Sequence, residues 1–147
     1  MGHYKQLLVA VDFSDPSVKA LQVACDMGKQ LDARLNVVHF VPMRIMDMGM
    51  EGGVDFIEEV HKKELEEAKV KLEKFVKQFA QADIRIEQHL RSGEPAAEVN
   101  TMAGEIGADI IVIGTHGRTG LKHLLLGSVA ESILKTADVP VVCVRSG

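Results

Sequence analysis

Residues 114–128 have the sequence GTHGRTGLKHLLLGS and connect a predicted strand to a predicted helix. The run before them, Asp109–Ile113, is short, apolar and rich in β-branched residues, which is typical of a fully buried strand. Ser128 stands three residues before Glu131, a spacing that predicts a capping box at a helix N-terminus. Free backbone N–H groups and the positive end of the helix dipole meet in such a loop. It therefore predicts a site for an anion such as a nucleotide phosphate.

The residue types in this loop suit phosphate binding. Gly114 and Gly117 allow the backbone to leave the strand sharply and approach a ligand without a Cβ, and Gly127 does the same before the helix. The Ser128 hydroxyl can cap the helix or touch a phosphate oxygen. Three side chains offer further positive charge: Arg118, Lys122 and His123. The alternative is that the glycines only shape turns, Ser128 only caps and the cations are solvated. The loop matches neither a Walker motif nor a dinucleotide fingerprint.

Strand and helix patterns alternate along the whole chain. Strands are predicted at 6–11, 35–41, 84–90, 109–113 and 139–144, and helices at about 14–31, 54–79, 94–106 and from 128 onward. Alternation of this kind predicts one α/β domain over residues 1–147, a doubly wound parallel sheet of five strands with helices on both faces. The clean polar alternation of 84–90 predicts an edge strand. Ligands of such sheets bind beyond the strand carboxyl ends, where the winding reverses.

Asp12 lies at the carboxyl end of the first predicted strand. If the winding reverses between the first and fourth strands, Asp12 and Gly114 become neighbours at one crevice. An aspartate there can accept hydrogen bonds from ribose hydroxyls or from a base. Ser14 or Asp15 is expected to cap the following helix, with Pro16 in its first turn.

Composition limits the other classes of function. The formal net charge of −4 does not favour a nucleic-acid-binding protein, which usually carries a basic stripe. We expect no membrane span, because the longest apolar runs have the length of strands. Cys25 and Cys143 lack metal-type spacing and fit buried, reduced thiols in the cytoplasm. The methionine-rich segment 43–53 suits either a lid or partner contact, or a plain connection.

The spacing Gly-x2-Gly-x9-Gly-Ser, formed by Gly114, Gly117, Gly127 and Ser128, resembles the signature of the universal stress protein family. The resemblance extends over the chain, through the stretches 8–14, 93–95 and 138–141. It implies the strand order 3-2-1-4-5 and ATP at the switch point. It also implies homodimers that pair through the last strand, Val139 to Val144. Such proteins act as cytoplasmic modules of stress response or signalling, and some hydrolyse ATP slowly.

The resemblance also implies a role for individual residues. Gly114, Gly117, Gly127, Ser128 and Val129 would hold the phosphates and ribose of ATP, with Mg2+ or Mn2+ bridging the phosphates. Asp12 and the backbone at Phe40 or Val41 would hold the nucleoside. Ala10 and Ile113 would line the site, with Ala10 in the place of a proline that some members carry. No catalytic residue and no protein-held metal is implied.

Three functions remain open on the sequence: an ATP-binding regulatory module, a slow ATPase or nucleotide transferase, and a nucleotide-free interaction protein. Hydrolysis of ATP needs a base positioned to activate water, and the loop residues that could act as this base are His116 and His123. A phosphoacceptor receiver domain is excluded, because its third strand must end in an aspartate. Here the third strand ends in Arg91-Ser92-Gly93.

Overall fold

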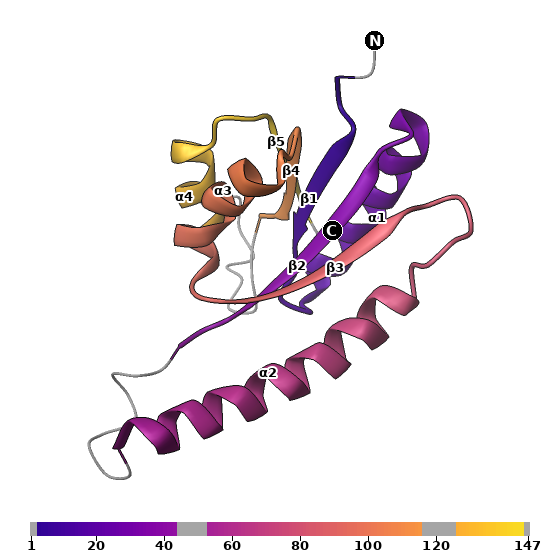
Figure 1. The fold of residues 1–147 in the computed structure, drawn as a ribbon. Helices are drawn as coiled ribbons and strands as arrows, with labels where there is room; N and C mark the ends of the chain where they lie inside the picture. The colour runs from indigo at the N-terminus through magenta and orange to yellow at the C-terminus, as the bar shows by residue number, and fades with distance from the viewer. Residues whose placement is uncertain (1–2, 44–52, 116–125, 146–147) are drawn as a thin grey trace.

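Figure 1 shows the computed structural model, which describes residues 3–43, 53–115 and 126–145. Strands and helices alternate along them without exception: β1 (Gln6–Ala10), α1 (Asp15–Leu31), β2 (Arg34–Val41), α2 (Gly53–Lys77), β3 (Ile86–Ser92), α3 (Pro95–Ile106), β4 (Ile110–Gly114), α4 (Ser128–Thr136) and β5 (Val141–Val144). These bounds lie within two residues of the predicted ones, where both ends were predicted. The described strands are all parallel and form one sheet in the order β3-β2-β1-β4-β5. This confirms the fold class and the strand order.

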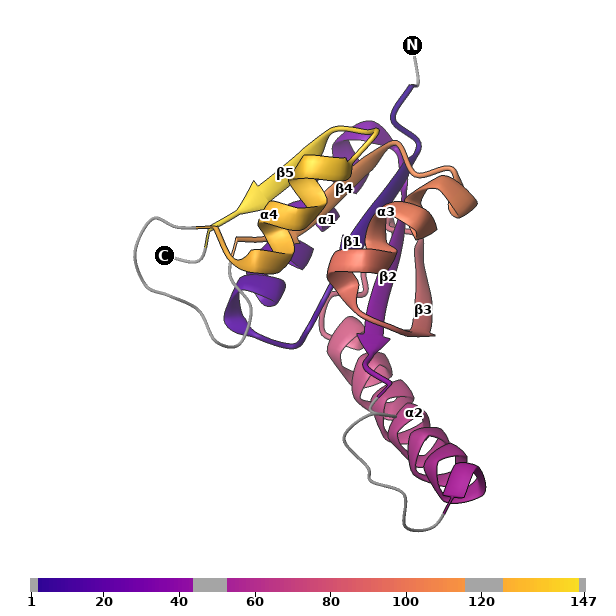
Figure 2. The same cartoon turned by 90° about the vertical axis from the view of Figure 1, so that its left-hand side faces the viewer.

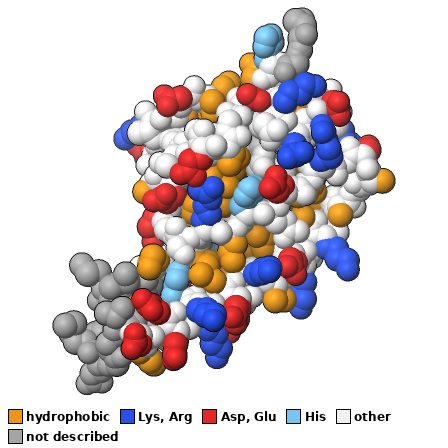
Figure 3. All heavy atoms as spheres, in the orientation of Figure 1, with side chains coloured by type: hydrophobic (Ala, Val, Ile, Leu, Met, Phe, Trp, Pro, Cys, Tyr) orange, Lys and Arg blue, Asp and Glu red, His pale blue; other side chains and the backbone are white. Residues whose placement is uncertain are grey.

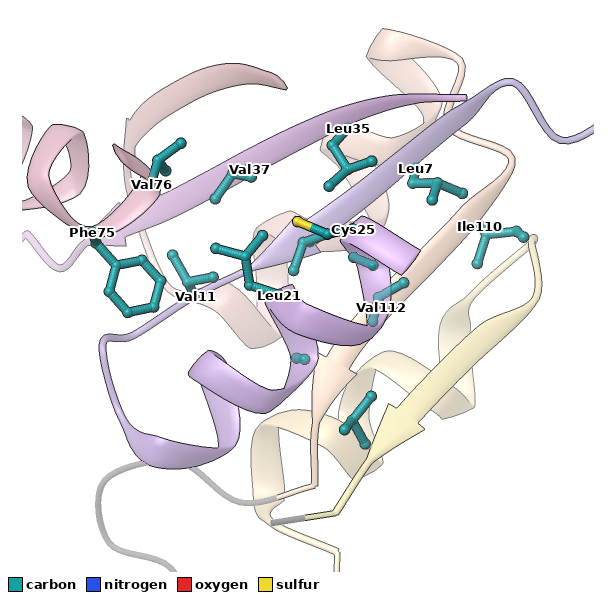
Figure 4. Packing of buried hydrophobic residues seen from close by; sticks show 14 of the residues in the cluster. Leu7, Val11, Leu21, Cys25, Leu35, Val37, Phe75, Val76, Ile110 and Val112 are labelled. Carbon is teal, nitrogen blue, oxygen red and sulfur yellow. The ribbon is translucent and has the colours of Figure 1, made fainter. Parts of the chain in front are cut away.

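Two apolar cores cover the two faces of the sheet. Leu7, Val9 and Val11 point to the face of α1 and α2, and Figure 4 shows Leu7 and Val11 packed with residues of both helices. Leu8 and the half-buried Ala10 point to the opposite face, under α3 and α4. Successive side chains of a strand point to opposite faces of the sheet. Because both faces are buried here, both sets of side chains are apolar, and this explains the continuous apolar runs in the sequence. The prediction of helices on both faces is confirmed.

The helix α2 packs against the sheet through its C-terminal half. Leu72, Phe75 and Val76 are buried, whereas Leu65 and Ala68 of the predicted apolar stripe are only half-buried. The N-terminal half of α2 projects beyond the sheet in both ribbon views (Figures 1 and 2). On the face shown in Figure 3, basic and acidic side chains are interspersed around apolar patches. No helix of the described residues is long and apolar enough to cross a membrane.

Two local predictions differ from the structure. The capping box at Ser128 is wrong: α4 begins at Ser128, and the N-cap is Gly127, which has no side chain to accept a hydrogen bond. The prediction that both cysteines are buried holds for Cys25, but Cys143 is half-buried because β5 forms an edge of the sheet. Burial raises the pKa of both thiols, so each is held in its protonated form.

A close packing contact joins β4 to the start of α1. A Cβ added to Gly114 would lie 2.7 Å from the Pro16 Cβ and 3.1 Å from the carbonyl carbon and oxygen of Pro16. Two of these three atoms belong to the backbone, which cannot move aside as a flexible side chain can. Gly114 is thus required for the approach of two chain segments, whatever it also does for a ligand.

This contact predicts the effect of adding one methyl group. Gly114→Ala should lower the free energy of unfolding by about 2 kcal/mol, because overpacking forces the backbone apart. The matched control is Gly104→Ala in α3, where nothing lies within 4 Å of the added Cβ. There the change should raise stability by about 0.5–1 kcal/mol, since alanine is the better helix former. Urea unfolding of both variants measures the difference; equal effects would contradict the packing account.

Candidate functional site

The candidate site lies where β1 and β4 run side by side and the chain leaves them in opposite directions. Leu7, Leu8 and Val9 of β1 pair with Ile110, Ile111 and Val112 of β4. After β1 the chain passes to α1 on one face, and after β4 it passes to α4 on the other. The carboxyl ends of both strands, with the N-termini of two helices, therefore meet at one edge. This is the position at which a doubly wound sheet binds ligands.

Asp12 closes a tight turn between β1 and α1. Its carboxylate oxygen Oδ1 accepts hydrogen bonds from the Ser14 N–H at 3.1 Å, from the Ser14 hydroxyl and from the Ser17 hydroxyl at 2.6 Å. Its own N–H donates to the Ser17 Oγ at 2.8 Å. Of the two predicted candidates, Ser14 is the N-cap of α1, and its side chain accepts from the Ser17 N–H. The half-buried carboxylate is thus fixed by its own turn.

Phe13, inside this turn, has the left-handed backbone angle φ of +68°. Its ring contacts His39 of β2, with centroids 4.4 Å apart, and Phe75 of α2 edge-on at 5.3 Å. The Lys71 Nζ lies 4.7 Å from the centre of the same ring. A left-handed angle costs a non-glycine residue about 1–2 kcal/mol. Each aromatic pair stabilises a protein by about 0.5–1.5 kcal/mol, so these ring contacts can offset the cost of the left-handed angle.

The helix α4 begins beside the end of β4. The Gly127 N–H donates to the carbonyl oxygen of Thr115 at 2.6 Å, and the Thr115 N–H donates to Val144 of β5 at 3.0 Å. The first-turn N–H groups of a helix have no acceptor within it, and Gly127 supplies no side-chain acceptor for them. Ser128 and Val129, at this terminus, are exposed. The start of α4 therefore offers backbone donors and a positive dipole end to an anion.

The remaining predicted residues divide into three groups. Ala10 and Ile113 lie on the α3–α4 face, together with the buried side chain of Phe40. Val41 is buried, and its carbonyl oxygen accepts the Gly93 N–H at 2.9 Å. Others lie outside the described residues: Gly117, Arg118, Lys122, His116, His123 and positions 44–52 of the methionine-rich segment.

Sequence reasoning missed two residues of the Asp12 turn. Ser17 is only 5% exposed although it is polar, and its position in the first helical turn drew no functional interpretation. The available signal was a hydroxyl residue on the buried side of α1, where an apolar residue is usual. Phe13 gave no signal, because a left-handed angle at phenylalanine is rare and depends on contacts with β2 and α2.

The chemistry of this donor set fits a phosphorylated nucleoside. Backbone N–H groups at Ser128 and Val129, in the first turn of α4, suit an anion, and the carboxylate of Asp12 can accept hydrogen bonds from hydroxyl or amino groups. Both groups lie at the same edge of the sheet. The fold and site define a doubly wound α/β protein in which the carboxyl ends of β1 and β4 lie next to the N-termini of α1 and α4.

Comparison with known proteins identifies the family. The sequence profile of the Universal stress protein family matches residues 3–145. Universal stress protein MJ0531 of Methanocaldococcus jannaschii is 35% identical over 143 residues, which are 97% of this chain and 82% of that protein. The chain therefore belongs to the universal stress protein family.

Solved structures agree with this assignment. The structure of protein MJ0577, a universal stress protein of Methanocaldococcus jannaschii, has a TM-score of 0.80 and 30% identity, covering 99% of this chain and 98% of that one. A universal stress protein of Archaeoglobus fulgidus, solved in complex with dAMP, has a TM-score of 0.59 and 29% identity, covering 96% and 98%.

The strained turn predicts an unusual order of stabilities at position 13. Phe13→Ala loses the ring contacts and keeps the left-handed cost, whereas Phe13→Gly loses the same contacts and removes that cost. Phe13→Gly should therefore be more stable than Phe13→Ala by about 1 kcal/mol, although glycine is normally the more destabilising residue. Urea unfolding compares the two. A less stable glycine variant would show that the angle carries no strain.

Proposed function

We propose that this protein is an ATP-binding regulatory module of stress response or signalling, acting in the cytoplasm. One observation carries the proposal: the N-terminus of α4, whose N-cap Gly127 has no side-chain acceptor, and the Asp12 turn lie at the same switch point between β1 and β4. Membership of the universal stress protein family supports it. Further support comes from the Archaeoglobus fulgidus relative, whose structure holds the adenine nucleotide dAMP.

In this proposal the site divides into a phosphate half and a nucleoside half. Gly114, Gly127, Ser128 and Val129 hold the phosphates and ribose, with Gly117 and Arg118 of the same loop. Asp12 and the backbone at Phe40 or Val41 hold the nucleoside, between Ala10 and Ile113. Mg2+ or Mn2+ would accompany the nucleotide and neutralise negative charge on its phosphates. These residues bind and orient the nucleotide, and none is assigned to cleave it.

The division predicts how binding responds to a change at Asp12. Asp12→Ala should weaken ATP and AMP by similar factors, about tenfold, because both ligands share the nucleoside and lose the same hydrogen bonds. Asp26→Ala, which removes an exposed carboxylate from α1, is the matched control and should bind as the wild type does. Isothermal titration calorimetry measures the constants.

Two results would contradict the proposal. Freshly purified protein that neither contains an adenine nucleotide by mass spectrometry nor binds added ATP would exclude the nucleotide site. Equal thermal stabilisation by ATP, AMP and an unrelated anion would show a general anion site in its place.

We also propose that the protein forms homodimers through its last strand, Val139 to Val144. The described β5 pairs with β4 alone and so forms an edge of the sheet. The Pro140 and Val144 carbonyls accept hydrogen bonds from Ile111 and Thr115 on the β4 side. Because strand groups alternate with a period of two, Cys143 directs its N–H to the open edge.

This direction allows a selective disruption of the dimer. Cys143→Pro removes an outward N–H while sparing the β4 ladder, and should convert the dimer to a monomer. Gln88→Pro is the matched control, because the Arg85 carbonyl and the Gly93 N–H face β2 and Gln88 therefore faces the other open edge. Size-exclusion chromatography with light scattering measures the mass. A dimer that survives Cys143→Pro and dissociates with Gln88→Pro would place the interface on β3.

A further inference from the structure

We propose that Ser17 is a positioning residue for the nucleotide site, acting through the Asp12 carboxylate. The inference rests on the proposed function and adds a residue that touches no ligand. Ser17 is buried, with 5% of its surface exposed, in the first turn of α1. A hydroxyl in such a place must be hydrogen-bonded, since burying it without a partner is costly.

The two shortest hydrogen bonds of the Ser17 hydroxyl are both with Asp12, and a longer one, at 3.4 Å, comes from the Ser14 hydroxyl. The Ser17 Oγ accepts the backbone N–H of Asp12 at 2.8 Å and donates to the Asp12 Oδ1 at 2.6 Å. A hydroxyl has one proton to donate, and here it goes to the carboxylate. Backbone and side chain of Asp12 are therefore fixed to the same atom. Rotation of the carboxylate would leave a buried donor unpaired, which costs free energy.

Helix capping does not account for this arrangement. The N-cap of α1 is Ser14, whose side chain accepts the Ser17 N–H, so the Ser17 hydroxyl is not needed as a cap. The turn is also fixed from both sides, by the packing of Pro16 on Gly114 and by the ring contacts of Phe13. Within a turn already held in place, the Ser17 hydroxyl joins the N–H and hydroxyl of Ser14 in fixing the orientation of one carboxylate.

The consequence is a preorganised acceptor for the nucleoside. A carboxylate fixed before binding loses less conformational freedom when the ligand arrives, and this favours affinity. Only ligands that contact Asp12 gain from it. Loss of the Ser17 hydroxyl should therefore weaken ATP and AMP alike and leave the binding of inorganic triphosphate unchanged.

A double-mutant cycle on the full chain separates positioning from a merely structural role. Ser17→Ala should weaken ATP and AMP about tenfold, the worth of one hydrogen bond, measured by calorimetry. The pair Ser17→Ala with Asp12→Ala should bind no more weakly than Asp12→Ala alone, because Ser17 acts only through that carboxylate. Ser132→Ala is the matched control: it removes a half-buried hydroxyl that donates to Ala96 of α3, and should leave all constants unchanged.

Each result decides the matter. The positioning role would be overturned if Ser17→Ala binds ATP with wild-type affinity, or if the losses in binding free energy of the two single variants add in the double variant. The nucleotide site itself would still stand in both cases, provided that the wild-type protein binds ATP. A wild-type protein that binds no nucleotide would overturn the proposed function and this inference with it. If Ser17→Ala does not fold, Ser17→Cys carries the same test, since it fills the space with a much weaker donor.

Discussion

The close approach of Gly114 to Pro16 is the constraint on which the arrangement of the candidate site depends. It brings the end of β4 against the first turn of α1, at a distance that no Cβ permits. The Asp12 turn lies directly before that helix, and the Thr115–Gly127 hydrogen bond brings α4 back to the same place. The packing of Gly114 against Pro16 thus holds the Asp12 turn and the start of α4 at the same edge of the sheet.

Most of the fold could be predicted from the sequence because its strands are buried on both faces. Runs such as residues 7–11 and 110–113 are short and apolar and contain β-branched residues, a combination that favours a fully buried strand. The alternation with helices then restricts the sheet to parallel connections. The strand order could not be predicted from the alternation alone, because this pattern does not show between which strands the winding reverses. The resemblance to the family supplied the order 3-2-1-4-5.

Residues whose conformation depends on distant contacts could not be predicted. The left-handed angle of Phe13 requires His39 and Phe75, which lie far along the chain. Ser128 resembled an N-cap from its spacing, yet α4 begins at that residue because Gly127 is held by Thr115. The apolar stripe of α2 was identified, but which half of it meets the sheet depends on where β2 and β3 end. Sequence reasoning could place Asp12 and Gly114 at neighbouring strand ends, but it could not identify Ser17 and Phe13, whose positions depend on tertiary packing.

The central claim is that an adenine nucleotide binds at the strand ends between β1 and β4. Amide NMR of the uniformly 15N-labelled protein during an ATP titration tests it most directly. We expect the largest shift changes at Asp12, Gly114, Ser128 and Val129, with little change at the far ends of the strands, near Gln6 and Ile110. Absence of any change, or changes confined to α2 and β3, would contradict the account.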